Sequence, residues 1–466
     1  MDELKILRNI KSQEKLIRNR VAVRTRKTRL CEYVARAAMA VALIWTLTIQ
    51  VMHLSKAWQP ALAMSKFYKN LVAGEYESNG YLIVSSNGGL NQMRSGLDTK
   101  SFWKDQSQFE DIFDVDHFIN SLRDEVRIVK QLPPDMQREV NTNRHISMQP
   151  ISWSNISYYT DKVLDGSLKN HKILHFQKTD SRLENNGPLE VQKVRCKASY
   201  EALKFRASIE KMGKKIVKIM RQKKGKFLVL HLRYEMDMLA FTGCNQGCTD
   251  EEAKELEGLR YSIPWWRKKK INSTTTRLAG LCPLTPEETA LTLQALGVDR
   301  KMQIYIAAGD IYGGEKRLAP LRAAYPNLVK KETLLPPSEL LPFKKYATRM
   351  AALDYIVSLE SDIFLPTYGG NMARLVEGHR RYLGFRPTIQ PDQKALVHLI
   401  DKYEKNQNWE EFEQGVKKAH ENRYGNPTKR RVIPGKPKEE DNFWSNPEEC
   451  LIKTNIIEKS ECPMWK

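Results

Sequence analysis

A short apolar stretch, Phe227 to Leu230, ends abruptly at a cluster of charged side chains. Bulky and branched residues without polar alternation are typical of a strand buried on both faces of a parallel sheet. Four ionisable residues follow within seven positions: His231, Arg233, Glu235 and Asp237. They would lie at the carboxyl end of the strand, where open α/β sheets bind ligands. Arg233 is central, because a planar guanidinium can bind two phosphate oxygens at once. The alternative is a strand end closed by a surface salt bridge.

Strands and helices alternate along the second half of the chain. A capping box with proline at the first helical position, Thr285-Pro-Glu-Glu288, starts one helix. Further strands are expected at Met302–Ala307, Leu328–Lys331 and Asp362–Pro366, and further helices at Leu318–Ala324, Arg349–Val357 and Gly370–His379. Pro320 would fall in the first turn of its helix, where proline is tolerated. This alternation favours a parallel, doubly wound sheet.

Two turns have the composition of phosphate-binding sites. In Asn87-Gly-Gly-Leu-Asn-Gln-Met-Arg94, which follows the expected strand Tyr81–Ser85, two adjacent glycines let backbone amides approach a ligand closely. Thr367-Tyr-Gly-Gly370 follows another strand and opens a helix, so its hydroxyl and amides would lie at a helix N-terminus. A plain tight turn and an ordinary helix cap are the respective alternatives.

Further strands and helices are expected on both sides of these motifs. Strands are expected at Ile128–Leu132 and Ile173–Phe176, and one helix is expected over Arg195–Met220. Near the C-terminus, two helices are expected between residues 394 and 423, and a basic loop is expected at Lys429–Lys438.

The N-terminal segment is rich in lysine and arginine, and the apolar run Ala37–Leu54 follows it. That run is just long enough to cross a bilayer, which takes ~18–20 residues. The excess of cations before it predicts a cytosolic amino terminus. Because no small-residue cleavage site is obvious, we interpret the run as a retained signal anchor. A buried core helix or a targeting peptide is the alternative.

The chain has a net charge of +21. Part of this charge belongs to the N-terminal segment and part to the C-terminal basic loop, and the remaining cations are scattered among acids without aromatic residues between them. A nucleic-acid partner is therefore not expected. A basic folded part suits acidic substrates such as nucleotide sugars or polyanionic glycans.

Cysteines and glycosylation motifs indicate the secretory pathway. Cys31 precedes the apolar run, and six cysteines that could form three disulfides follow it: Cys196, Cys244, Cys248, Cys282, Cys450 and Cys462. Cys244 and Cys248 have the spacing of half a zinc site, but no second pair of ligands follows nearby, so structural oxidised cysteines are expected rather than a metal. Asn155 and Asn272 begin glycosylation triplets.

Three blocks of the sequence, in order, resemble the plant protein O-fucosyltransferase family. They are Asn87-Gly-Gly-Leu-Asn-Gln-Met-Arg94, His231-Leu-Arg-Tyr-Glu-Met-Asp-Met-Leu-Ala-Phe-Thr-Gly-Cys244, and Thr367-Tyr-Gly-Gly-Asn-Met-Ala-Arg374 with Gly378-His-Arg-Arg381. This family of Golgi type II membrane glycosyltransferases has the pectin rhamnosyltransferases as relatives. The resemblance extends from about Tyr81 to Cys450. It implies an α/β fold of the GT-B type, with two Rossmann-like domains and the donor between them, and inverting transfer without a metal or cofactor.

The resemblance implies transfer of fucose from GDP-fucose to a protein or glycan acceptor in the Golgi. Arg233 would neutralise the leaving diphosphate, and Glu235 or Asp237 would either deprotonate the acceptor hydroxyl or support Arg233. The expected donor contacts are Asn87, Gly88, Gly89, Asn91, Arg94, His231, Arg233, Asp354, Thr367 and Tyr368. Among these, Asp354 would recognise the purine. The alternatives are a UDP-rhamnose-dependent pectin rhamnosyltransferase, or a nucleotide-sugar-binding membrane protein that is impaired in catalysis.

One departure from the family pattern follows Arg94. A helix and a strand that family members carry there are missing, and Arg94 runs almost directly into Leu97-Asp-Thr-Lys-Ser-Phe-Trp103. The expected organisation is a cytosolic tail (1–36), a transmembrane anchor (37–54), a stem (55–78), a shortened N-terminal Rossmann-like domain (79–215), a C-terminal nucleotide-sugar-binding domain (216–400) and a helical, basic tail (401–466).

Overall fold

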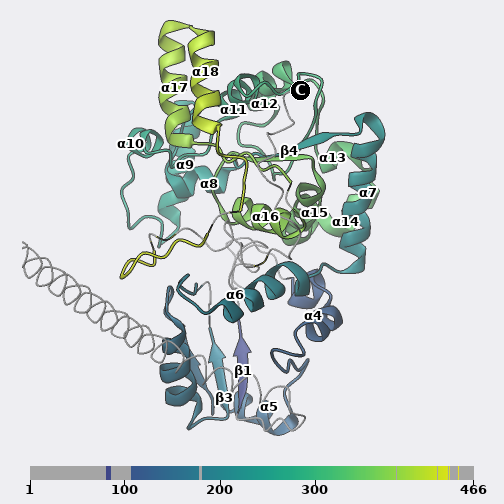
Figure 1. Ribbon diagram of the computed structural model, residues 1–466, viewed down its shortest axis with the longest axis vertical. Coiled ribbons are helices and arrows are strands. Elements are labelled where there is room, and N and C mark those ends of the chain that lie inside the picture. Colours follow the sequence, from purple (N-terminus) through teal and green to yellow (C-terminus); the bar gives the residue numbers. More distant parts are fainter. Residues whose placement is uncertain are drawn as a thin grey trace, which may run out of the picture. The chain divides into compact units, whose positions relative to one another are not determined.

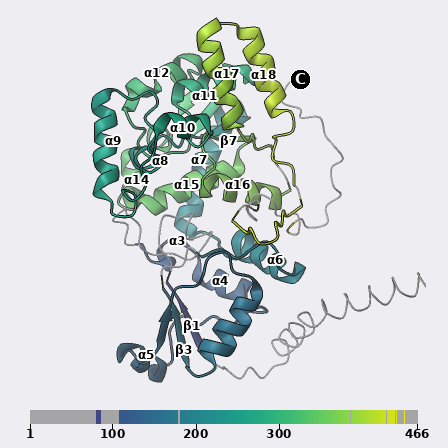
Figure 2. The ribbon, with the colours of Figure 1, turned by 90° about the vertical axis from the view of Figure 1, so that its left-hand side faces the viewer.

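The computed structural model describes residues 80–85, 107–177, 181–384, 386–427, 429–438, 440 and 450 (Figures 1 and 2). All of them belong to one compact unit, Glu77–Lys466. The predicted anchor at 37–54 and the glycine block at 87–94 lie outside the described residues. Within these ranges, no helix has the length and apolarity needed to cross a bilayer. The predicted domain boundaries stay predictions.

The first sheet has three parallel strands in the order β1-β3-β2. They are β1 (Tyr81–Val84), β2 (Ile146–Met148) and β3 (Ile173–Phe176). The helical elements before β3 are α3 (Phe109–Ile112), α4 (Val115–Ser121), α5 (Pro134–Asn141) and η1 (Tyr158–Leu168). Leu174 and Phe176 alternate with the other residues of β3 and pack with Val163 of η1 in a small core, as period-two burial requires.

The strand predicted at Ile128–Leu132 is wrong. These residues form no strand, and Val129 is 42% exposed while Lys130 pairs with Asp116 on the surface. Only Ile128 and Leu132 are half-buried, and they are four positions apart. A strand needs apolar residues at every second position to bury one face, so this segment has nothing to hold it in a sheet.

The single helix predicted over Arg195–Met220 is broken into three pieces. They are α6 (Leu189–Cys196), η2 (Lys197–Ala202) and α7 (Ala207–Lys224). The break before α7 places Phe205 against Phe113, where the two residues form a β-bridge and their rings stack at 5.5 Å between centroids. Burial of this aromatic pair outweighs the continuous helical period of the sequence.

The second sheet has four parallel strands in the order β6-β5-β4-β7. The strands are β4 (Phe227–His231), β5 (Gln303–Ile306), β6 (Leu328–Val329) and β7 (Ile363–Pro366). The helices are α8 (Met236–Thr242), α9 (Asp250–Ser262), α10 (Ser273–Leu278), α11 (Pro286–Ala295), α12 (Gly314–Ala324), α13 (Lys331–Leu334), α14 (Pro337–Lys344), α15 (Ala347–Glu360), α16 (Asn371–Tyr382), α17 (Gln393–Asn406) and α18 (Trp409–His420).

Helices cover both faces of this sheet, which confirms the predicted doubly wound α/β fold. Phe227 and Val229 of β4 pack in one core with residues of α7, α15 and α16. Leu228 and Leu230 point the other way and pack with residues of α11, α12, α17 and α18. The capping box at Thr285 is present, with the Thr285 hydroxyl accepting from the Glu288 amide. Pro320, by contrast, lies inside α12, which already begins at Gly314 after a left-handed Gly313 (φ 80°).

Two disulfides, Cys196–Cys450 and Cys244–Cys282, confirm part of the predicted oxidised framework. Cys248 carries a free thiol 3.6 Å from the Tyr234 hydroxyl, and Cys462 lies outside the described residues. In the described part of the chain, no group of His, Cys, Asp and Glu side chains is arranged to hold a metal.

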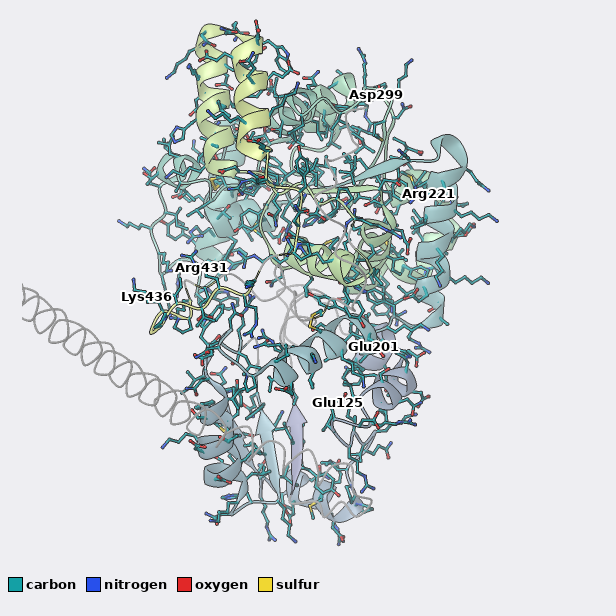
Figure 3. All side chains as sticks on the ribbon, in the orientation of Figure 1. Glu125, Glu201, Arg221, Asp299, Arg431 and Lys436 are labelled. Atoms are coloured by element: carbon teal, nitrogen blue, oxygen red, sulfur yellow. A yellow bond between two sulfur atoms is a disulfide. The ribbon has the colours of Figure 1, made fainter. Side chains whose placement is uncertain are left out.

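The basic segment Lys429–Lys438 forms a loop, as predicted, and Figure 3 labels two of its side chains, Arg431 and Lys436. The loop is attached to residues far away in sequence. The buried carboxylate of Glu440 accepts hydrogen bonds from the amides of Asn185 (2.9 Å) and Ile433 (3.1 Å). The amide of the Asn185 side chain donates in turn to the Arg431 carbonyl.

Candidate functional site

The carboxyl ends of β4 and β7 bring two of the predicted site residues together. His231 is in register with Pro366 in this parallel pair, and the Thr367 amide continues the ladder to the His231 carbonyl at 3.0 Å. The Arg233 amide then donates to the Thr367 hydroxyl at 3.0 Å. Because neighbouring parallel strands end at the same edge of a sheet, residues 134 positions apart meet here.

The Arg233 guanidinium is held by the two predicted carboxylates. Its Nη1 lies 2.6 Å from Glu235 Oε2 and 3.1 Å from Asp237 Oδ1, and its Nη2 lies 2.6 Å from Asp237 Oδ2. The three side chains are 22%, 14% and 13% exposed, so this is a mostly buried ion cluster and not a surface pair. Burial alone would lower the pKa of Arg233, but the two carboxylates raise it above its ordinary value, which keeps the cation charged.

Glu235 also connects this cluster to the neighbouring strand. Its second oxygen, Oε1, accepts from the amide of Gly309, which follows β5, at 3.2 Å. Both carboxylates therefore position Arg233 in this structure. This is one of the two roles that the sequence predicted for them. Whether either acts as a base stays a prediction.

His231 is buried at the end of β4, and its Nδ1 lies 2.8 Å from the Ala307 carbonyl. A carbonyl only accepts, so Nδ1 carries the proton. Burial lowers the pKa of the imidazole below its ordinary value, against the smaller opposing effects of Glu235 and the Ala307 bond. His231 is thus neutral, with a lone pair on Nε2 that can accept a hydrogen bond from a ligand hydroxyl.

We expect acid to destabilise the chain through His231. Because the folded-state pKa is lowered, the unfolded chain takes up this proton first, and the contribution of neutral His231 is lost as the pH falls below about 6.5. Between about pH 7.5 and pH 5.5 the melting temperature of the wild type should fall further than that of His231→Gln. His398→Gln, an exposed position on α17, serves as the control and should follow the wild type. Parallel falls for wild type and His231→Gln would contradict the assignment.

Positive charge gathers at the N-terminus of α16. Its N-cap, Gly370, provides no side-chain hydrogen bond to the first turn of the helix. Tyr368 lies in the field of both Arg233 and Arg374; burial raises the pKa of its hydroxyl, and the two cations oppose that shift. A helix N-terminus attracts anions, and the arginines add to that attraction.

Arg182 is a member of this site that the sequence reasoning missed. Its Nη2 donates to Oδ1 of Asn371, the first residue of α16, at 2.9 Å, and its guanidinium lies 5.9 Å from the centre of the Trp153 ring. Arg182 follows β3 by only a few residues. The rule that placed ligand groups after β4 and β7 would have found it, had it been applied to Ile173–Phe176.

Asp354 belongs to a buried network at the edge of β5. Its carboxylate accepts from the Tyr305 hydroxyl at 2.7 Å and from the Lys331 ammonium at 2.8 Å, and Lys331 also donates to the Ala308 carbonyl. Burial raises the pKa of Asp354 to about 6, although Lys331 and Tyr305 oppose the shift. Its purine-recognising role stays a prediction.

The arrangement can bind an anion and stabilise charge on it. A fixed guanidinium, a neutral imidazole with a free lone pair and a helix N-terminus converge on the carboxyl edge of the second sheet. The predicted contacts at Asn87, Gly88, Gly89, Asn91 and Arg94 lie outside the described residues.

Comparisons with known proteins identify the family of the chain. The family model of GDP-fucose protein O-fucosyltransferase matches residues 96–383. Rhamnogalacturonan I rhamnosyltransferase 1 of Arabidopsis thaliana is 52% identical over 455 residues, which cover 89% of this chain and 89% of that protein. O-fucosyltransferase 38 of the same plant is 45% identical over 407 residues, covering 81% of this chain and 77% of that protein.

Among solved structures, POFUT1 in complex with GDP aligns at a TM-score of 0.38 and 12% identity, over 67% of this chain and 97% of that chain. The resemblance to the family is confirmed by the family model, which spans more than half of the chain and includes the second and third sequence blocks. The chain therefore belongs to the GDP-fucose protein O-fucosyltransferase family of glycosyltransferases.

Proposed function

We propose that this protein is an inverting glycosyltransferase that transfers a 6-deoxyhexose from a nucleoside diphosphate to a glycan acceptor. The observation that carries the proposal is the position of Arg233, which is bonded through its amide to Thr367 at the carboxyl edge of the second sheet. A diphosphate bound there would meet the guanidinium and the first-turn amides of α16. In a GT-B arrangement the first sheet would contribute the opposite side of the donor site.

The chemistry requires charge stabilisation on the leaving diphosphate. As the bond between the anomeric carbon and the phosphate oxygen breaks, the acceptor oxygen forms the new bond from the opposite face and releases its proton. Arg233 would stabilise the growing negative charge, an effect of ~3–4 kcal/mol for one well-placed donor. Once the guanidinium turns to the diphosphate, Glu235 or Asp237 is released from part of its ion pair and can accept the proton.

Rhamnose is the favoured sugar. The rhamnogalacturonan I rhamnosyltransferase 1 is 52% identical to this chain over an alignment that covers 89% of each protein, whereas O-fucosyltransferase 38 is 45% identical over a shorter alignment. The proposed reaction is thus rhamnosyl transfer from UDP-rhamnose to a pectin chain. Fucosyl transfer from GDP-fucose is the second candidate, supported by the family model.

A Golgi membrane location is part of the proposal. It is supported by the cation-rich segment before the apolar run at 37–54, which favours a type II anchor. The two disulfides also favour an oxidising compartment.

A donor screen on the full chain tests the proposal. UDP-rhamnose and GDP-fucose are each supplied with pectic oligosaccharide and peptide acceptors, and both the transfer product and the released nucleotide are measured. Rhamnosyl transfer from UDP-rhamnose alone is the expected result, and fucosyl transfer would select the second candidate. Nucleotide-sugar binding without turnover would overturn the enzymatic proposal and would point to the segment missing after Arg94. A version with a family helix and strand restored there would then be assayed beside it.

A further inference from the structure

A patch of exposed aromatic and basic side chains lies at the C-terminal end of α8. Phe241, Tyr261 and Trp265 are 47%, 46% and 63% exposed. Four consecutive exposed cations, Arg267 to Lys270, follow Trp266. No aspartate or glutamate occurs between Arg260 and Pro286, so this stretch is an exception to the scattering of cations among acids elsewhere. We name Phe241, Tyr261, Trp265 and Arg267–Lys270 the aromatic–basic patch.

The patch is held in one conformation by a buried arginine. Arg260 of α9 is 8% exposed, and its Nη1 donates to the carbonyls of Ala240 (3.0 Å) and Phe241 (2.5 Å) at the end of α8. Its Nη2 donates to the carbonyls of Trp266 (2.8 Å) and Lys269 (3.1 Å). One guanidinium thus joins α8 to the loop that carries the cations. These elements are labelled close together in Figures 1 and 2.

Side-chain packing reinforces this connection. The rings of Phe241 and Trp266 meet edge to face with centroids 5.6 Å apart. Gly243 ends α8 in the left-handed conformation (φ 68°), and a Cβ there would lie 2.9 Å from the Ile271 side chain. The loop therefore wraps closely around the end of α8, which requires glycine at that position. The backbone that carries the exposed rings is thus tied to the end of α8.

The same helix connects the patch to the site at Arg233. Asp237, which binds the Arg233 guanidinium, lies in the first turn of α8, and Phe241 lies four residues later. Residues four apart share a helix face and are separated by about 6 Å along the axis. The patch therefore lies within reach of an extended ligand whose end is bound at Arg233.

We propose that the aromatic–basic patch binds the acceptor as a glycan chain with carboxylate groups, that is, one that contains uronic acids. This inference rests on the proposed function and adds to it the surface that binds the acceptor. An exposed aromatic ring packs against the apolar face of a sugar ring, and the lysine and arginine groups pair with the carboxylates. Contiguous exposed apolar surface marks an interaction site.

The test compares two triple variants of equal charge change in the full chain. The patch variant carries Arg267→Gln, Lys268→Gln and Lys270→Gln. The control variant carries Lys211→Gln, Lys214→Gln and Lys218→Gln, three exposed positions on α7. A third variant, Trp265→Ala, removes an exposed ring without changing charge. All are made with Asn272→Gln, so that a glycan at that neighbouring sequon does not affect the comparison.

Direct binding is measured first, because it does not depend on turnover. Galacturonate-containing oligosaccharides are expected to bind the control variant as tightly as the parent. They should bind the patch variant and Trp265→Ala about tenfold more weakly. Only in the patch variant should the affinity also depend less on salt, because only that variant loses cations of the patch. A neutral oligosaccharide of equal length should bind weakly to every variant. Under turnover, the KM for the acceptor should rise by a similar factor while the KM for the donor and the donor hydrolysis rate stay unchanged.

Three outcomes overturn the inference. The first is equal uronate binding by the patch and control variants. The second is equal binding of neutral and acidic oligosaccharides. The third is binding to vesicles that contain phosphatidylserine, lost in the patch variant, without binding to uronate; this would assign the patch to a membrane surface. Failure of the donor screen with intact uronate binding would remove the proposed function and leave the glycan-binding surface in place.

Discussion

The Arg233→Ala variant is expected to lose at least ~100-fold in kcat/KM while the protein stays folded. The loss follows from removing the guanidinium that Glu235 and Asp237 hold at the carboxyl edge of the sheet, whereas the backbone amide that binds the Thr367 hydroxyl remains. A side chain that mainly stabilises the charge of the transition state contributes more to kcat than to binding of the sugar nucleotide. Its loss should therefore lower kcat more than it weakens that binding. Arg233→Lys should recover only part of the rate, because a lysine cannot bind two oxygens in one plane.

Removing Arg233 also affects stability, so a matched control is needed. Without the guanidinium, Glu235 and Asp237 face each other as like charges in a mostly buried setting, and the melting temperature should fall by a few degrees. Arg277 offers the comparison: it is also mostly buried and bridges two carboxylates, Glu288 and Asp401, each at 2.7 Å. Arg277→Ala should lose similar stability and keep its kcat/KM. Full activity in Arg233→Ala would refute its role.

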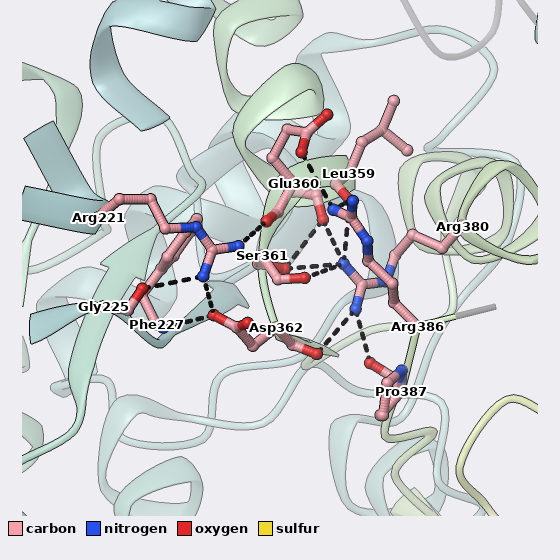
Figure 4. A network of polar contacts seen from close by, with 11 residues as sticks. Arg221, Gly225, Phe227, Leu359, Glu360, Ser361, Asp362, Arg380, Arg386 and Pro387 are labelled. Atoms are coloured by element: carbon pink, nitrogen blue, oxygen red, sulfur yellow. Dashed lines mark hydrogen bonds and ion pairs between the residues drawn. The ribbon is translucent and has the colours of Figure 1, made fainter. Parts of the chain in front are cut away.

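The second large effect is expected at Arg380, near the C-terminal end of α16. Its fully buried guanidinium makes seven hydrogen bonds, all to neutral acceptors in Ser358, Leu359, Ser361, Asp362, Pro387 and Thr388. Figure 4 labels Arg380 with its acceptors in Leu359, Ser361, Asp362 and Pro387. These acceptors lie at the end of α15, at the start of β7 and after α16. One side chain thus fixes the helix whose N-terminus faces Arg233.

Arg380→Met should destabilise the fold by at least ~3 kcal/mol, because several buried carbonyls lose their donor. At ~2–4 °C per kcal/mol for a domain of this size, the melting temperature would fall by roughly 6–12 °C. Thermal unfolding measures this, and the donor KM of the surviving protein should rise because α16 is less firmly held. Arg386→Gln is the control: it shares the Leu359 carbonyl but its side chain is 39% exposed, so its loss should be small. Equal melting temperatures for both variants would contradict this account.

The sequence predicted the second sheet well because its signals are local. Each strand there is an apolar run between a helix cap and a polar end, and β4, β5 and β7 fall where those runs occur. Ile128–Leu132 has a similar length, but only its two end residues are half-buried and the three residues between them are exposed. Whether an apolar run forms a strand depends on whether other elements cover it, and that is decided by the tertiary structure.

The sequence predicted which residues belong to the site but not how their side chains contact one another. The spacing of Glu235 and Asp237 placed both near Arg233, but a sequence does not say whether a carboxylate faces a cation or a substrate. The bond from Arg182 to Asn371 joins residues 189 positions apart, and the pairing of Cys196 with Cys450 spans 254. Such contacts depend on how the two sheets are connected, so local patterns do not contain them.

The most direct test of the central claim is a crystal structure of the protein with a bound nucleoside diphosphate. The account predicts diphosphate oxygens within hydrogen-bond distance of the Arg233 guanidinium and of the first-turn amides of α16. A diphosphate bound elsewhere, with Arg233 still paired to Glu235 and Asp237 as in the free protein, would contradict it.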